Sequence, residues 1–228
     1  MKKLIKFLLS FFVFLTSCNR QVNIEILFNS IFELVVGNSK DDIVGYATCF
    51  KAKDLGIVTN CHNILYVDVN GNLNTYNYIA GKVYNSNVII ELVASKYSYE
   101  DDFAILIPND KDKELYDEIT ALNYNNSNNF NISDKCYCIG NLNNYGLSYN
   151  EGSISSKLKK LEYHNKENYF IQTNLEISKG VSGSPLFDAN NDVIGVVTFK
   201  LRDSSLEYID GLSFAIPISE IFKNLSDL

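Results

Sequence analysis

The sequence has no tryptophan, one methionine, three prolines and two histidines among its 228 residues. It also has no dense cluster of basic residues, and its formal net charge is −7. Because non-specific nucleic-acid binding requires clustered lysine and arginine side chains facing phosphates, we expect no nucleic-acid partner. The chain has no low-complexity tract and no short repeat, which argues against a solenoid. Its 46% hydrophobic residues are typical of a globular protein with a sizeable core.

The apolar run near the N-terminus, Phe7 to Leu15, is too short to cross a bilayer permanently. It follows Lys2, Lys3 and Lys6, which is the arrangement of a secretory signal peptide. The run ends in Leu15-Thr16-Ser17-Cys18, which resembles the bacterial lipobox.

The lipobox resemblance implies that residues 1–17 are removed and that Cys18 is lipidated and becomes the first residue of the mature chain. Residues 18–29 would then form a short tether. Several acyl chains on one residue anchor a protein stably, so we expect an exported protein attached to a membrane of the bacterial cell envelope. An ordinary signal peptide with an incidental cysteine is the alternative.

The other cysteines do not have the CxxC spacing of a zinc site. Outside the cytoplasm four cysteines can pair in three ways, although we prefer buried, unpaired thiols. Two of them are two residues apart on a predicted strand, so their side chains face the same way. The four are Cys49, Cys61, Cys136 and Cys138.

Short apolar, β-branched runs separated by turn residues predict a chain made largely of strands. In the first half they are Ser30–Val36, Ala47–Phe50, Gly56–Thr59, Val88–Val93 and Phe103–Ile107. In the second half they are Lys135–Ile139, Glu151–Ser156, Tyr169–Thr173, Ser184–Phe187, Val193–Phe199 and Leu212–Ile216.

Other segments divide these strands into two groups. Asn70–Asn72 predicts a tight turn, and the charged residues 111–118 predict a loop or one helical turn. The Asn-rich stretch 123–131 marks the connection between the two halves, and the last residues, from Ile218, have helix-like spacing. Two strand-rich halves of similar size favour two barrels with a cleft between them over a βαβ fold.

Three short segments carry residues suited to nucleophilic catalysis. His62 follows the apolar strand 56–59, and histidine is the side chain whose ordinary pKa lies near neutrality, which suits a general base. Asp102 stands directly before an apolar strand, where a partly buried carboxylate can orient a histidine. Ser182 lies between Gly180 and Gly183, and these glycines allow a tight turn that exposes the serine.

Together the three segments indicate a catalytic triad more strongly than any one of them does alone. Their order, His then Asp then Ser, is the order of chymotrypsin and differs from the orders of subtilisin and the α/β-hydrolases. His62 and Asp102 lie in the first half and Ser182 in the second, so a triad would form across the cleft. The backbone amides of Gly180 and Ser182 are placed to form an oxyanion hole.

These segments resemble those of the trypsin-like serine proteases, especially the Deg/HtrA-type envelope proteases and, less closely, the V8-like endopeptidases. Thr59–His62 resembles T-N-x-H, Asp102–Leu106 resembles D-[IL]-A-x-L, and Gly180–Pro185 resembles G-N-S-G-G-P. The resemblance runs from about Ser30 to the C-terminus. It includes the further segments Ile139–Asn141, Gly152–Ser155, Gln172–Asn174 and Gly211–Pro217.

The resemblance implies an all-β, chymotrypsin-like fold with two antiparallel six-stranded barrels, at residues 30–125 and 126–228, and a C-terminal helix. It implies a serine endopeptidase acting on proteins or peptides, with no metal or organic cofactor. His62 would be the general base and Ser182 the nucleophile. Asp102 would be the orienting acid, with Asp101 a poorer candidate.

Substrate specificity is indicated less directly. Glu176 lies six residues before Ser182, where trypsin-like enzymes place the base of the S1 pocket, and Thr198 is a second S1 candidate. We therefore consider that Glu176 favours Lys or Arg at P1, or alternatively that it is a solvated loop residue. His164, in a polar stretch, is expected on the surface.

The departures from the family pattern leave a rival interpretation open. Val181 stands where the family has Asn or Asp, which raises the question of what holds the backbone that carries the Gly180 and Ser182 amides. Ser184 replaces a glycine, as in the V8-like branch. The sequence ends at Leu228, so we expect no PDZ domain. The alternative function is a binding module that keeps the fold and has lost catalysis.

Overall fold

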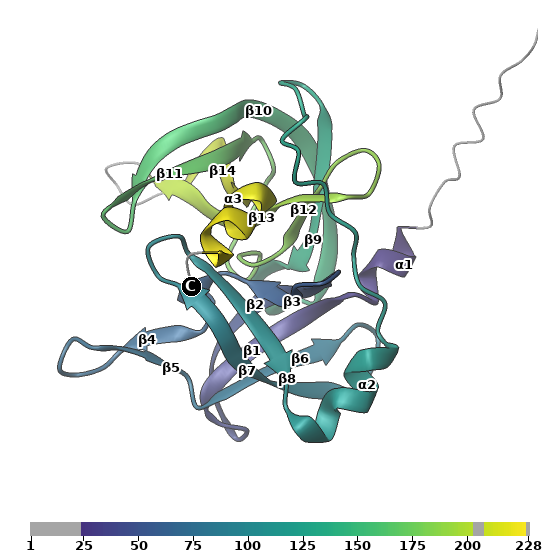
Figure 1. Cartoon of the computed structure of the whole chain (residues 1–228), viewed down its shortest axis with the longest axis vertical. Helices are drawn as coiled ribbons and strands as arrows, with labels where there is room; N and C mark the ends of the chain where they lie inside the picture. Colours follow the sequence, from purple (N-terminus) through teal and green to yellow (C-terminus); the bar gives the residue numbers. More distant parts are fainter. Residues whose placement is uncertain (1–23, 203–207, 227–228) are drawn as a thin grey trace, which may run out of the picture.

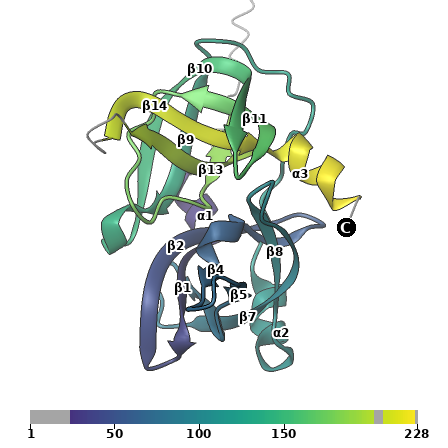
Figure 2. The same ribbon diagram turned by 90° about the vertical axis from the view of Figure 1, so that its left-hand side faces the viewer.

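The computed structural model describes residues 24–202 and 208–226, and they form two β-barrels placed one above the other (Figures 1 and 2). The predicted signal peptide and Cys18 lie outside the described residues. A short helix, α1 (Glu25–Phe28), leads into the first barrel, and helix α3 (Ile218–Leu225) follows the last strand of the second. The prediction of two six-stranded barrels with a C-terminal helix is confirmed.

The first barrel is closed and antiparallel, and its strands follow the order β1-β2-β3-β8-β7-β6. These strands are β1 (Ile31–Ser39), β2 (Asp42–Ala52), β3 (Gly56–Thr59), β6 (Tyr78–Val83), β7 (Ile89–Ser98) and β8 (Phe103–Pro108). A separate hairpin, β4 (Leu65–Val67) with β5 (Leu73–Thr75), projects beside it (Figure 1). A short 3-10 turn, Asp110–Asp112, and helix α2 (Lys113–Glu118) follow β8.

The second barrel is also closed and antiparallel, in the order β10-β11-β14-β13-β12-β9. Its strands are β9 (Lys135–Asn141), β10 (Leu147–Tyr163), β11 (Lys166–Thr173), β12 (Pro185–Phe187), β13 (Val193–Arg202) and β14 (Tyr208–Pro217). Between α2 and β9 the chain bridges both barrels, because Leu122 pairs with Ala52 and Tyr124 pairs with Val193.

Strand β6 is the barrel strand that the pattern did not predict. Its sequence, Tyr-Ile-Ala-Gly-Lys-Val, contains a glycine, which is uncommon in the middle of a strand. In the structure Gly81 pairs with Leu34 on β1, and a Cβ there would lie 3.1 Å from the Cβ of Phe32. The missing side chain therefore leaves room for a buried aromatic ring.

Three apolar clusters hold the molecule together, one inside each barrel and one between them. The cluster between the barrels includes aromatic residues of both, among them Phe50, Phe103, Phe187 and Phe214, together with Ile218 and Ile221 of α3. Full burial of one such side chain contributes about 1.5–3 kcal/mol, so several together fix the barrels against each other. A site built from both barrels is thereby held rigidly.

Candidate active site

His62 lies at the end of strand β3, in a single 3-10 turn, Cys61–Asn63. Cys61, the first residue of the turn, and Ile64, which follows it, are fully buried and anchor it in the first barrel. The His62 side chain is 33% exposed, so its ring is open to solvent on one side.

Asp102 occupies the turn that leads into β8, and its side chain is fully buried. Its φ of 51° is in the left-handed region, where few residues other than glycine and asparagine are found. The turn is closed by the Asp102 N–H, which donates to Tyr99 O at 3.3 Å, and the Asn60 side chain donates to Asp102 O at 3.0 Å. These contacts hold the carboxylate directly behind His62.

The two side chains form a close pair, with His62 Nδ1 at 2.9 Å from both carboxylate oxygens of Asp102. The His62 backbone N–H also donates to Oδ1 at 3.0 Å. Because an ionised carboxylate only accepts hydrogen bonds, Nδ1 carries the proton and Nε2 is left unprotonated in the neutral ring. That is the tautomer that a general base requires.

The pKa values of the pair are shifted apart by their contact. Burial disfavours the charged imidazolium, but the adjacent Asp102 carboxylate outweighs burial and raises the His62 pKa above its ordinary value of 6.5. Burial also disfavours the ionised carboxyl group, but the charge of His62 and the hydrogen bonds to His62 and Thr198 lower the Asp102 pKa. Asp102 therefore stays ionised, and His62 titrates above the usual range.

The second barrel supplies two more donors to Asp102. The Thr198 hydroxyl donates to Oδ2 at 2.6 Å, and the Tyr163 hydroxyl donates to the same oxygen at 3.3 Å. The carboxylate thus has partners from both barrels, although its own turn belongs to the first.

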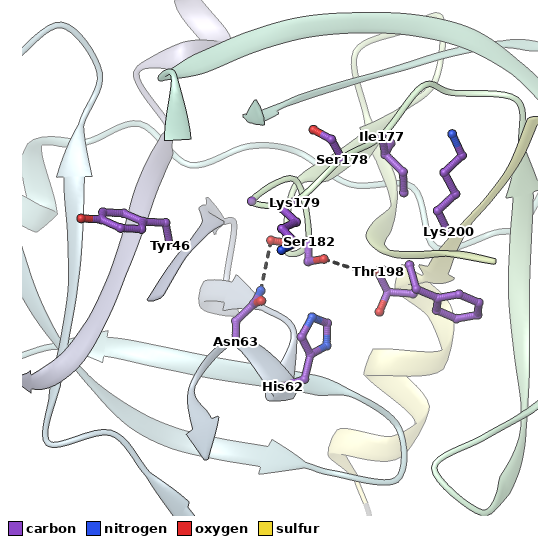
Figure 3. Close-up of a pocket in the computed structure, with 11 residues that line it drawn as sticks. Tyr46, His62, Asn63, Ile177, Ser178, Lys179, Ser182, Thr198 and Lys200 are labelled. Carbon is purple, nitrogen blue, oxygen red and sulfur yellow. Dashed lines mark hydrogen bonds between the residues drawn. The ribbon is translucent and has the colours of Figure 1, made fainter. Parts of the chain in front are cut away.

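Ser182 lies in the turn between Gly180 and Gly183, and it lines a pocket of about 400 Å³ together with His62 (Figure 3). The Ser182 hydroxyl donates to Thr198 O at 2.8 Å, and Figure 3 marks this bond. The Asn63 side chain donates to the backbone oxygen of Ser182 at 3.0 Å. The structure therefore brings His62 and Ser182 to one pocket, with the hydroxyl directed at Thr198.

Both glycines around Ser182 have a φ of 89°, which a residue with a side chain rarely adopts. A Cβ on Gly180 would lie 2.1 Å from Asn141 O, and one on Gly183 would lie 2.0 Å from Thr48 O. The turn can form only where no side chain is present at these two positions.

The Gly180 amide has a defined direction. Lys179 O accepts a hydrogen bond from Asn143 N–H at 2.7 Å. In a trans peptide the C=O and the following N–H point in opposite directions, so the Gly180 N–H points away from Asn143. Within the described residues, neither the Gly180 nor the Ser182 N–H donates to a protein acceptor.

Comparison with known proteins agrees with this architecture. The model of the family described as trypsin-like peptidase domain matches residues 47–196. The chain belongs to that family. Its relatives include serine endoprotease DegS of Haemophilus influenzae, 29% identical over 73% of this chain and 45% of DegS. A probable periplasmic serine endoprotease DegP-like of Rickettsia conorii is 30% identical over 71% of this chain and 29% of that protein.

The fold is also similar to that of a solved HtrA-type protease. A solved structure of the HtrA-type protease AlgW with tripeptide superimposes with a TM-score of 0.72 at 21% identity, covering 90% of this chain and 61% of AlgW. The chain spans less than half the length of the two curated relatives. The resemblance to trypsin-like proteases, and to their HtrA-type members, is confirmed for the peptidase domain.

The trypsin-like domain does not bring Glu176 into the pocket. Glu176 is exposed and is not among the residues that line the cavity, so the geometry argues against a role at the base of S1. Thr198 does line the pocket, and its buried hydroxyl is directed at Asp102, so it supports the carboxylate.

Two other predicted positions have different outcomes. Asp101 pairs with Lys166 at 2.6 Å and makes no contact with His62. His164 is partly exposed, as expected of a surface residue, and its ring stacks on those of Tyr99 and Tyr163, with centroids 4.2 and 4.1 Å away. The four cysteines in the described residues are buried and form no disulfide, which agrees with the preferred interpretation of unpaired thiols.

Sequence analysis missed the contributions of Thr198 to Asp102, Tyr163 to Asp102, and Asn63 to Ser182. Asn63 adjoins the T-N-x-H segment and could have been considered, because a side-chain amide can donate to a backbone carbonyl. Nothing in the local sequence singles out Tyr163, since its contact depends on how a long hairpin crosses between the barrels. In the parts of the chain that the structure describes, no helix is long and apolar enough to cross a membrane.

Proposed function

We propose that this chain is an exported, lipid-anchored serine endopeptidase in which Ser182, His62 and Asp102 form the catalytic triad. The observation that carries the proposal is the pairing of His62 Nδ1 with the buried Asp102 at 2.9 Å, beside a pocket that Ser182 also lines. This arrangement leaves Nε2 of His62 as a base near a nucleophile. Membership of the trypsin-like family, with serine endoproteases among the relatives, supports the same activity.

In the proposed reaction, Ser182 Oγ attacks the carbonyl carbon of a peptide bond while His62 Nε2 takes its proton. The oxygen of the tetrahedral intermediate accepts hydrogen bonds from the Gly180 and Ser182 amides. The C–N bond then breaks, and His62 returns the proton to the leaving amine. A water molecule, deprotonated by His62, attacks the acyl carbon. The bond from that carbon to Ser182 Oγ then breaks, His62 returns the proton to Oγ, and the carboxylic acid product leaves.

One rearrangement is required before attack. In the proposed reaction the Ser182 hydroxyl leaves Thr198 O by rotation about its Cα–Cβ bond and donates to His62 Nε2. Hydrogen bonds between nucleophile and base are often long or misaligned without substrate and tighten in the complex. The hydroxyl direction is therefore compatible with catalysis.

The same observation favours a second candidate function. A Ser182 hydroxyl that stays on Thr198 O would give a trypsin-like binding module without catalysis. A fluorophosphonate probe separates the two candidates when it is applied to the purified mature protein and to Ser182→Ala. We expect labelling of the wild type alone. Absence of labelling in folded wild-type protein would favour the binding module.

The proposed anchor at Cys18 has its own test. An alkyne fatty acid fed to an expressing bacterium should become attached to the wild-type chain and not to Cys18→Ala. Equal attachment in both would refute Cys18 as the lipidated residue. A processed but unlabelled wild type would indicate an ordinary signal peptide. The predicted domain ranges, 1–17, 18–29, 30–125 and 126–228, belong to the same proposal.

A further inference from the structure

Thr48 connects the two barrels at the loop that carries the proposed nucleophile. It lies on β2 of the first barrel, and its side chain is fully buried. We propose that Thr48 is a positioning residue whose hydroxyl holds the backbone of Lys179–Ser182, here called the oxyanion loop, in its working conformation. This inference rests on the proposed function, because it concerns how the same site is held.

The Thr48 hydroxyl is used as both donor and acceptor. It donates to Gly180 O at 2.7 Å and accepts from the Asn141 N–H at 2.9 Å. A hydroxyl has a single proton, and a carbonyl can only accept, so the direction of both bonds is fixed. One side chain of the first barrel thus joins the end of β9 to the oxyanion loop, both of which belong to the second barrel.

The backbone of Thr48 adds one more bond to the loop, because its N–H donates to Ser182 O at 3.0 Å. Its carbonyl accepts from the Thr59 hydroxyl at 2.8 Å, which fixes Thr48 within the first barrel. Asn63 donates to Ser182 O as well. The carbonyls of Lys179, Gly180 and Ser182 are therefore all occupied by donors outside the loop.

The hydrogen bonds to these carbonyls fix the orientation of the peptide groups in the oxyanion loop. A glycine with a φ of 89° has no side chain to restrain it, so the peptides around Gly180 would rotate readily without external bonds. Rotation of the Lys179–Gly180 peptide would turn a carbonyl toward the position of the oxyanion. Asn143 holds this peptide, and Thr48 holds the adjoining Gly180–Val181 peptide, which fixes the backbone between the two amides.

Val181 explains why this tie matters in this chain. Its side chain is fully buried among the apolar residues inside the second barrel. Because it has no polar atom, it makes no hydrogen bond to hold the loop. The polar restraint must come from outside the loop, and the Thr48 hydroxyl is the side chain in the structure that supplies it to Gly180 O.

The test compares Thr48→Val with Thr48→Ser. Valine keeps the shape and removes the hydroxyl, which leaves Gly180 O and the Asn141 N–H without their partner, whereas serine retains the hydroxyl. We expect Thr48→Val to lower kcat about 10- to 100-fold with KM within about twofold, as for loss of an oxyanion-hole interaction. Thr48→Ser should retain at least about a third of wild-type kcat.

Two further variants guard against a general folding effect. Thr173→Val removes another buried threonine hydroxyl, on β11, and should leave kcat unchanged. If Thr48→Val does not fold, Thr48→Ala and Thr48→Ser provide the same contrast, since they differ only in the hydroxyl. A kcat that is equal with and without the hydroxyl would overturn the proposal, as would equal impairment of the serine variant.

Hydrogen exchange measured by mass spectrometry over residues 178–184 gives a readout that does not depend on activity. We expect faster exchange there in Thr48→Val and wild-type rates in Thr48→Ser, with residues of β7 unchanged in both. Unchanged exchange over 178–184 in the valine variant would refute the positioning role. An inactive wild type that shows the expected exchange difference would instead refute the proposed function alone.

Discussion

The hydroxyl of Tyr163 lies 3.3 Å from Oδ2 of Asp102, although the two residues belong to different barrels. Tyr163 ends strand β10 at the tip of the β10–β11 hairpin, and its ring stacks on Phe199 at 4.7 Å. The same tip contacts the turn before Asp102 through the Lys166–Asp101 ion pair at 2.6 Å. The hairpin therefore contributes to holding the buried carboxylate, at the oxygen that also lies 2.9 Å from His62 Nδ1.

This contact predicts a modest loss of activity in Tyr163→Phe. A hydrogen bond to a charged group contributes about 1.5–3 kcal/mol at good geometry, and this one is long, so we expect kcat/KM to fall about fivefold. The remaining donors to the carboxylate, His62 and Thr198, explain why the loss is small. Steady-state kinetics on a peptide substrate measures it, with Tyr169→Phe, an exposed residue of β11, as the control.

The pH profile offers a second readout for the same variant. Loss of the Tyr163 donor leaves more negative charge on the carboxylate oxygen that faces His62, which raises the His62 pKa. The acidic limb of the kcat/KM profile should therefore move to higher pH in Tyr163→Phe. A variant with wild-type kcat/KM and an unshifted limb would show that the Tyr163 contact is only structural.

The wild-type pH profile tests the His62–Asp102 pair itself. His62 must be neutral to accept a proton, and its pKa is raised above 6.5 by Asp102 despite burial. Activity is therefore lost as pH falls through the raised pKa, and the midpoint of the acidic limb should lie above 6.5. In Asp102→Asn this raised limb should disappear along with most of kcat, and a wild-type midpoint at or below 6.5 would contradict the pairing.

The parts of the site that sequence predicts are those defined by short contiguous segments. His62, Asp102 and Ser182 each lie in a turn next to a strand, where a few residues set the local geometry. Tyr163 and Thr48 reach the site only because long strands bring distant segments together, and no local pattern reports this. Strand β6 was missed for a related reason, because its glycine is accommodated by the ring of Phe32 on a neighbouring strand.

The pocket beside Ser182 predicts discrimination against basic P1 residues. Among the described residues that line it, none is Asp or Glu and two are lysines, Lys179 and Lys200, whereas Ile177 and Phe199 offer apolar surface. A Lys or Arg side chain would lose water there without gaining a countercharge. We expect peptides with Leu or Val at P1 to be cleaved at least about tenfold faster than the Arg peptide, which corresponds to about 1.4 kcal/mol.

Glu176→Gln supplies the control for this specificity. Because Glu176 is exposed and outside the pocket lining, its neutralisation should leave the ratio of Leu to Arg cleavage unchanged. Faster cleavage of the Arg peptide by the wild type, abolished by Glu176→Gln, would restore the earlier assignment of Glu176 to S1.

Val181 provides the last prediction, because it departs from the family pattern at a buried position. Its side chain is fully buried among apolar residues of the second barrel, including Ile154, Leu186 and Ile194. Val181→Asn would place an amide there without an evident partner, which costs about 1–3 kcal/mol. In a domain of this size each kcal/mol lowers Tm by about 2–4 °C, so we expect Tm to fall by roughly 5 °C.

The matched control is Val93→Asn, since Val93 is 47% exposed on β7 and its replacement should change Tm by less than about 2 °C. Activity measured below the melting range separates stability from loop geometry. If the Thr48 hydroxyl holds the oxyanion loop, folded Val181→Asn should retain most of its kcat. A stable Val181→Asn with raised kcat would show instead that the loop lacks a polar anchor at this position, and that the family residue improves it.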